Sequence, residues 1–101
     1  MDFTNKLIGG NSPYIQSLNY NLSKREIVIH LLSSADSSTV SLVVTFPKIT
    51  EFKESLEEID DQLVDSIIWI NYLSQNQVCI KTELREIMFS MDGVPHAEKV
   101  T

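Results

Sequence analysis

The chain is poor in residues that support covalent, metal or cofactor chemistry. Among its 101 residues it has one cysteine, Cys79, and two histidines, His30 and His96. One cysteine cannot form a disulfide within the chain, and no pair of His or Cys has the spacing of a metal site. The only glycine pair, Gly9-Gly10, is not followed by the Lys-Ser or Lys-Thr element of a phosphate-binding loop. We therefore expect no catalytic residues, no metal and no cofactor.

Long hydrophobic runs are missing as well. No apolar stretch approaches the ~20 residues that span a bilayer. The first residues lack the basic segment followed by an apolar one that marks a secretory signal. The lone cysteine lies in the apolar run Val78-Cys79-Ile80, which favours a small buried side chain in a reducing compartment. These absences predict a cytoplasmic protein that is not embedded in a membrane.

Basic residues are nearly absent from one stretch that carries the net charge of the chain. Residues 51–65, the acidic stretch, contain seven of the fourteen acidic residues and a single base, Lys53. The rest of the chain is neutral on balance, and the formal net charge is −6. The seven carboxylates are the candidate partner-binding residues: Glu51, Glu54, Glu57, Glu58, Asp60, Asp61 and Asp65.

An acidic stretch of this kind repels phosphate backbones and attracts basic protein surfaces. We therefore expect a basic protein partner and no direct binding of nucleic acid. The alternative interpretation is a solvated segment that keeps the domain soluble.

Alternation of apolar and polar side chains predicts a mainly β fold. Residues 40–46 show the clearest half-buried pattern, and Pro47 follows them. Ile67-Ile68-Trp69-Ile70 is apolar on both faces, which suits a central strand covered on both sides. The predicted strands comprise residues 14–20, 25–32, 40–46, 67–70, 77–81 and 86–89.

The acidic stretch itself is ambiguous in secondary structure. Ile49, Phe52, Leu56, Ile59 and Leu63 recur at spacings of three and four, the period of a helix. Against a helix, its last turn would carry carboxylates, which oppose the helix dipole. Helix and irregular strand therefore both stay open for this segment.

Together these patterns predict an antiparallel sheet of about six strands, curled into a half-barrel or a small sandwich. The alternative is an α+β fold with one helix near residues 50–63. The turn formers around Gly9-Gly10 and Asp92-Gly93 divide the chain into an N-terminal arm or loop (1–13), a single globular domain (14–91) and a C-terminal tail (92–101).

Strand parity also predicts the core. The side chains expected to be buried are Ile29, Val44, Ile68, Ile70, Val78, Ile80 and Phe89. Trp69 is expected in the core as well, because it lies in the most apolar segment.

From residue 43 to residue 89 the order of strand, acidic linker, apolar strand, turn and two strands resembles that of small immunity proteins. Strings such as Asp65-Ser66-Ile67-Ile68 and Arg85-Glu86-Ile87 contribute to the likeness. Such proteins belong to bacterial polymorphic-toxin and contact-dependent growth inhibition systems. The resemblance implies a non-catalytic antitoxin that binds a cognate toxin, often a basic nuclease, inside the cell.

We therefore expect an immunity protein that neutralises a basic, nuclease-type toxin through its acidic surface, as a monomer or weak homodimer. Two alternatives remain. One is a structural or accessory domain that assembles with itself through strand edges. The other is a small hydrolase that uses two carboxylates.

Overall fold

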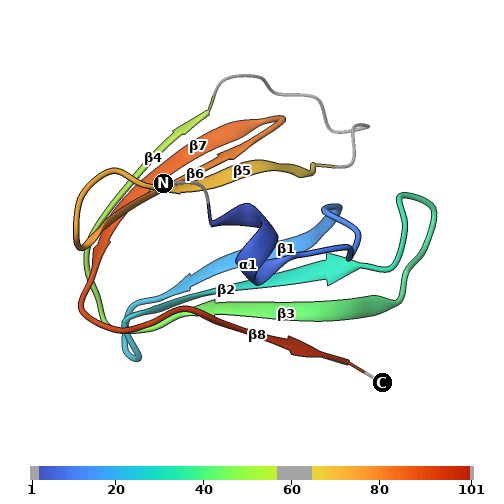
Figure 1. Ribbon diagram of the computed structural model, residues 1–101, viewed down its shortest axis with the longest axis horizontal. Coiled ribbons are helices and arrows are strands. Elements are labelled where there is room, and N and C mark those ends of the chain that lie inside the picture. Colours follow the sequence, from blue (N-terminus) through green and yellow to red (C-terminus); the bar gives the residue numbers. More distant parts are fainter. Residues whose placement is uncertain (1–2, 57–64, 101) are drawn as a thin grey trace.

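The fold consists of two antiparallel four-stranded sheets that face each other (Figure 1). The computed structural model describes residues 3–56 and 65–100. Its elements are α1 (Thr4–Leu7), β1 (Ile15–Asn21), β2 (Glu26–Leu32), β3 (Val40–Phe46), β4 (Ile49–Leu56), β5 (Ile67–Tyr72), β6 (Gln77–Thr82), β7 (Arg85–Met91) and β8 (His96–Lys99). The strand orders are β1-β2-β3-β8 and β4-β7-β6-β5, and the sheets are not closed into a barrel. The prediction of a mainly β fold is confirmed.

The core lies between the two sheets and follows the alternation of the strands. In the first sheet Ile29 of β2 pairs with Val44 of β3, and in the second Ile80 of β6 pairs with Ile87 of β7. All four side chains are fully buried. Of the seven predicted core residues, six are buried: Ile29, Val44, Ile70, Val78, Ile80 and Phe89.

The expectation of a central apolar strand at 67–70 is wrong, because β5 is an edge strand. Its register shifts between Ile67 and Trp69, so Ile67 and Ile70 both point into the core. Ile68 is 47% exposed. Trp69 pairs with Lys81 and is only half-buried, so it does not belong to the core as predicted. A bulge puts one extra residue into a strand and thereby inverts its parity.

Of the two possibilities left open for residues 50–63, the helix is wrong for the described part of that range, because Ile49–Leu56 forms the bulged strand β4 along β7. The helical spacing has a physical cause. A register shift between Ile49 and Glu51 turns the buried Ile49 and the half-buried Phe52 toward the same face. Apolar residues three apart therefore share the core side of a bulged strand.

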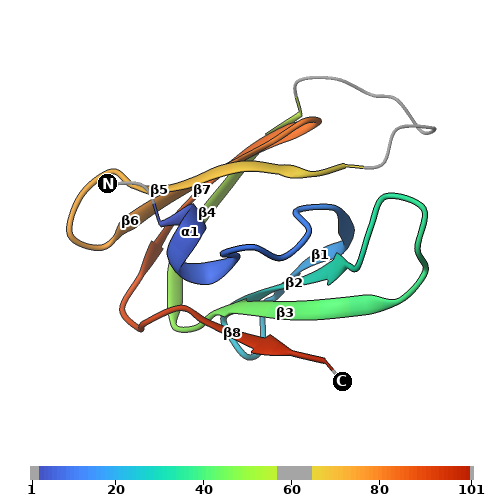
Figure 2. The same cartoon turned by 45° about the vertical axis from the view of Figure 1, so that its right-hand side comes forward.

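The N-terminal segment is part of the folded body, which corrects the expectation that residues 1–13 form a separate arm. Leu7 and Ile8 are buried in the core. The Phe3 N–H donates to the Ile70 carbonyl oxygen (N···O 2.6 Å), and the Thr4 hydroxyl accepts the Ile70 N–H (2.8 Å). The Phe3 ring also packs edge to face against Tyr72. Helix α1 thus covers the open edge of β5 (Figure 2).

Within the range 92–101, where a tail was expected, residues 96–99 form strand β8. Strand β8 pairs antiparallel with β3, with Ala97 opposite Val44 and His96 opposite Thr45. The pairing supplies hydrogen-bond partners to the backbone N–H and C=O groups at this edge of β3. The four residues of β8 are too few and too polar for their own pattern to reveal a strand.

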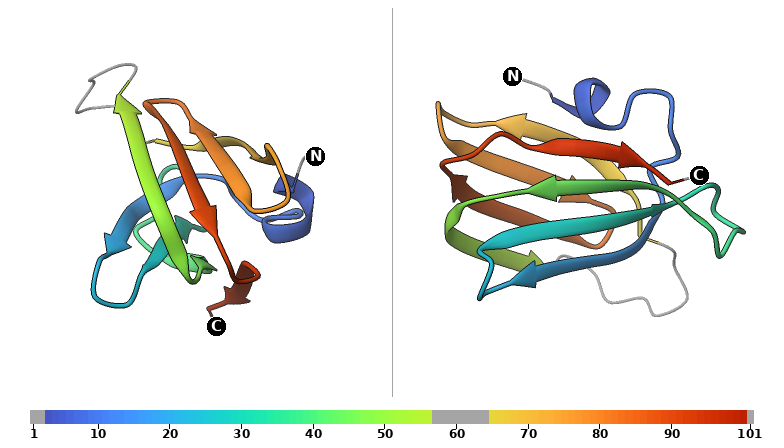
Figure 3. Two further views of the ribbon diagram at one scale, coloured as in Figure 1. Left: turned by 90° about the vertical axis from the view of Figure 1, so that its left-hand side faces the viewer. Right: turned by 90° about the horizontal axis from the view of Figure 1, so that it is seen from below.

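The opposite side of the sandwich is closed by an aromatic pair between two edge strands. Tyr20 of β1 and Phe52 of β4 stack with ring centroids 4.8 Å apart. Figure 3 shows these strands at the same side of the two sheets. Among the described residues, no helix has the length and hydrophobicity that crossing a bilayer requires.

Replacing Thr4 with Val tests the attachment of the N-terminal segment. The change preserves side-chain shape but leaves the Ile70 N–H without its acceptor, which costs about 1–3 kcal/mol for a buried donor. We expect this loss in the free energy of unfolding measured by urea denaturation. The exposed Thr50→Val variant is the control and should stay within about 0.5 kcal/mol of the wild type. Equal stability of the two variants would contradict this attachment.

Candidate functional site

Strand β4 presents the first acidic residues on two different faces. Glu51 pairs with Ser90 and Lys53 pairs with Met88, so these side chains lie on the face of the sheet that points away from the core. Glu51 and Lys53 are both exposed. Glu54 lies on the other face at the end of the strand. This alternation separates Glu51 from Glu54, although both belong to the acidic stretch.

Asp65 is the acidic residue that the structure places inside. It is 7% exposed, and its Oδ1 accepts the N–H groups of Ser66 (2.9 Å) and Leu84 (3.2 Å). Its Oδ2 accepts the hydroxyl of Thr82 (3.0 Å). The carboxylate thus joins the start of β5 to the turn between β6 and β7. Its hydrogen bonds make Asp65 a structural group rather than a surface group.

Arg85 connects Asp65 with Glu54. Its Nη1 donates to Glu54 Oε1 at 3.1 Å. Its Nε lies 3.3 Å from Asp65 Oδ2, but the N–H is not aligned to make a hydrogen bond, so this contact is a charge attraction only. Glu54 therefore has a cation of its own and is less available to a partner than Glu51. The remaining predicted residues, Glu57, Glu58, Asp60 and Asp61, lie outside the described residues.

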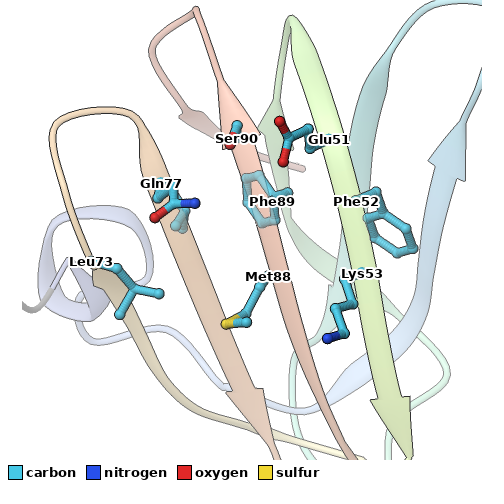
Figure 4. A pocket seen from close by; sticks show the side chains of 9 residues that line it. Glu51, Phe52, Lys53, Leu73, Gln77, Met88, Phe89 and Ser90 are labelled. Atoms are coloured by element: carbon cyan, nitrogen blue, oxygen red, sulfur yellow. The ribbon is translucent and has the colours of Figure 1, made fainter.

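The face of the β4-β7-β6-β5 sheet that points away from the core, the outer face, carries exposed apolar side chains. Leu73 is 54% exposed and Met88 38%. Between them and the start of β4 lies an open hollow of about 180 Å³. Figure 4 shows Met88 between Leu73 and Lys53, with Gln77, Ser90 and Glu51 around them. This volume is below the ~300 Å³ of a typical small-molecule pocket, so the hollow suits a single side chain of a protein partner.

Sequence reasoning missed this face because it searched for charge. A signal was present in the sequence. Met88 lies two residues from Glu86 and two from Ser90, so all three share the side of β7 that points away from the core. An apolar residue at an outward position is the pattern that predicts an exposed contact residue. The exposed Ile68 and the half-buried Trp69 of β5 extend the apolar character of the outer face.

Cys79 also lies on the outer face, opposite Met88, yet it is buried as predicted, at 2% exposure. Burial raises the pKa of its thiol. The Glu86 carboxylate, which accepts a hydrogen bond from the thiol, raises this pKa further, and Lys81 acts in the opposite direction. A thiol held in its neutral form is a poor nucleophile.

The histidines lie on the opposite sheet. His30 of β2 contacts Ser17 of β1, with Ser17 Oγ 3.1 Å from His30 Nδ1. The pair resembles a nucleophile and its base, but a catalytic arrangement needs a third group that orients the histidine. Residues 3–56 and 65–100 contain no cluster of three or more His, Cys, Asp or Glu side chains arranged to hold a metal ion.

No protein-family model, curated protein or solved structure matches the chain. Its function is therefore argued from the residues of the outer face and the distribution of charge.

Replacing Asp65 with Ala should destabilise the fold of the protein in the absence of any binding partner. The variant removes the acceptor of three hydrogen bonds and the charge beside Arg85, and we expect a loss of about 2–4 kcal/mol in the free energy of unfolding. Glu51→Ala is the matched control and should change stability by less than about 0.5 kcal/mol. Urea denaturation of both variants makes the comparison. A loss below about 1 kcal/mol for Asp65→Ala would show that its network is dispensable.

The raised pKa of Cys79 predicts a dependence of stability on pH. Above the ordinary thiol pKa of about 8.5 the unfolded chain releases a proton that the folded chain retains. Stability therefore falls as pH rises from there through the folded-state pKa. Above this pH we expect the free energy of unfolding of the wild type to fall relative to that of Cys79→Ala. Tyr72, whose pKa burial also raises, is present in both proteins and cancels. A difference that stays constant with pH would contradict the shift.

Proposed function

We propose that the chain is a non-catalytic immunity protein that neutralises a basic, nuclease-type protein toxin by stoichiometric binding in the cytoplasm. One observation carries the proposal: exposed apolar side chains on the outer face stand beside the strand on which the acidic stretch begins. Leu73 and Met88 supply the apolar part, and Glu51 lies at the rim of the same hollow. An apolar centre with a charged rim is the usual composition of a protein interface.

The chemistry of the hollow favours an Arg or Lys side chain of the partner. Such a side chain has an apolar stem and a charged head. The stem fits against Met88 and Leu73, and the head lies within reach of Glu51 at the rim. Acidic residues farther along the chain attract a basic partner over a longer distance and raise the association rate.

Self-assembly through strand edges has less support. The edge of β5 is already hydrogen-bonded to the N-terminal segment, through Phe3 and Thr4. Strand β4 is at the edge of its sheet in the described part of the chain, and it carries the charged side chains Glu51, Lys53 and Glu54, which oppose the addition of another strand. A hydrolase has no site among the described residues that would favour it.

The product of the neighbouring gene is the partner to test, by coexpression and by calorimetry. We expect coexpression to suppress its toxicity and the purified pair to form a 1:1 complex. Met88→Ala should weaken binding by about 1–2 kcal/mol because it removes apolar contact at the centre of the interface. Glu51→Gln should lower the association rate, whereas Lys53→Gln should raise it, because Lys53 repels a basic partner.

Glu98→Gln is the control, because Glu98 lies on β8 of the other sheet. It removes the same charge without touching the outer face, and the association rate should change less than with Glu51→Gln. Opposite signs for Glu51 and Lys53 are the decisive result. If Met88→Ala, Glu51→Gln and Lys53→Gln all bind with the affinity and association rate of the wild type, the outer face is not the binding surface.

A further inference from the structure

A second site lies away from the outer face, at the end of the sandwich where β1 turns into β2 and β3 turns into β4. Both turns lie at the same end of the molecule (Figures 1 and 3). Together they form a cleft of about 290 Å³, the basic cleft, lined by Lys24, Arg25, Lys48, Ile49, Thr50 and Asp92. Three of the eight basic residues of an acidic protein therefore meet in one place.

Backbone hydrogen bonds hold the two turns together. The Ile49 N–H donates to the carbonyl oxygen of Arg25 (2.8 Å), and the Asp92 N–H donates to that of Lys48 (3.0 Å). Gly93 packs so closely on Pro47 that an added Cβ would lie 2.8 Å from the proline Cγ. The walls of the basic cleft are thus fixed by the fold and do not depend on the long side chains that line it.

The cations of the basic cleft are not neutralised within the described part of the chain. Among the described residues no carboxylate lies within 4.0 Å of Lys24, Arg25 or Lys48, whereas Arg85 forms ion pairs with Glu54 and Asp65. Asp92 is the single acidic residue of the lining. Three positive charges and one negative charge leave a net charge of about +2, which is the complement of a dianion.

Two of these basic residues also have backbone conformations that favour glycine. Arg25 has a φ of 52° and Lys48 a φ of 57°, both in the left-handed region. Side chains with a Cβ are disfavoured there, and glycine is not. Residues in such conformations persist where the surrounding structure enforces them, and they cluster at ligand sites.

We propose that the basic cleft binds a dianionic tetrahedral oxyanion, a phosphate group, either as the free ion or as a small phosphate monoester. The Arg25 guanidinium suits two parallel hydrogen bonds to one phosphate, and the ammonium groups of Lys24 and Lys48 add charge from either side. The site is independent of the toxin-binding function proposed for the outer face.

Amide chemical shifts measured by NMR test the proposal. Inorganic phosphate and phenyl phosphate are titrated separately at constant ionic strength, with sodium chloride as the compensating salt. We expect saturable shifts at residues 24, 25, 48–50 and 92 and none on β8. The ligand that binds more tightly shows whether the cleft takes the free phosphate ion or a phosphate monoester. Equal shifts with chloride alone would show general screening and overturn the proposal.

Variants separate binding from backbone strain. Arg25→Gln with Lys48→Gln should weaken phosphate binding about tenfold or more, and Lys99→Gln on β8 should leave it unchanged. Arg25→Gly with Lys48→Gly should lose binding equally but melt several degrees higher than the glutamine variant, because glycine relieves the positive φ. Phosphate binding retained by the glutamine variant would overturn the proposal.

Discussion

The polar contacts of Asp65 connect the two sheets, because its side chain binds one sheet and its backbone carbonyl binds the other. Its side chain binds the start of β5 and the turn between β6 and β7, while its backbone carbonyl oxygen accepts the Ile15 N–H of β1 at 2.8 Å. One residue therefore joins both sheets. A buried carboxylate is tolerated only when its oxygens are hydrogen-bonded and a cation lies nearby, and Arg85 is that cation. The apolar faces of the sheets supply the stability, and the polar contacts of Asp65 add a link between them.

Much of the fold was predictable because regular strands show their parity in the sequence. The pairs in β2–β3 and β6–β7 alternate without interruption near their centres, and there the predicted inward residues are buried. The errors at β4 and β5 have one physical cause. Bulges near the starts of β1, β4 and β5 place apolar residues three apart on the same face, as in Ile15 and Leu18 or Ile67 and Ile70. A spacing of three is the signature of a helix, so a bulged strand is misread from sequence alone.

The candidate site was only partly visible for a similar reason. Charge can be counted along a sequence, and the acidic stretch was found that way. Whether a carboxylate faces solvent or the interior depends on contacts between distant segments, and Asp65 acquires its role only when β6 and β7 turn beside it. Likewise, Lys24 and Lys48 come together only because two turns lie side by side. Clusters built across strands leave no spacing motif in the chain.

The order of the strands has a consequence for how the protein is made. The sheet of β1, β2 and β3 contains neighbours in sequence and can pair as soon as residue 46 has left the ribosome. Strand β4 has no such neighbour, because its partner is β7, and β3 receives its last partner only when β8 has been synthesised. Nascent chains therefore carry an unpaired, half-apolar β4 until residues 85–91 emerge. The late strands β7 and β8, rather than the early ones, complete the two sheets.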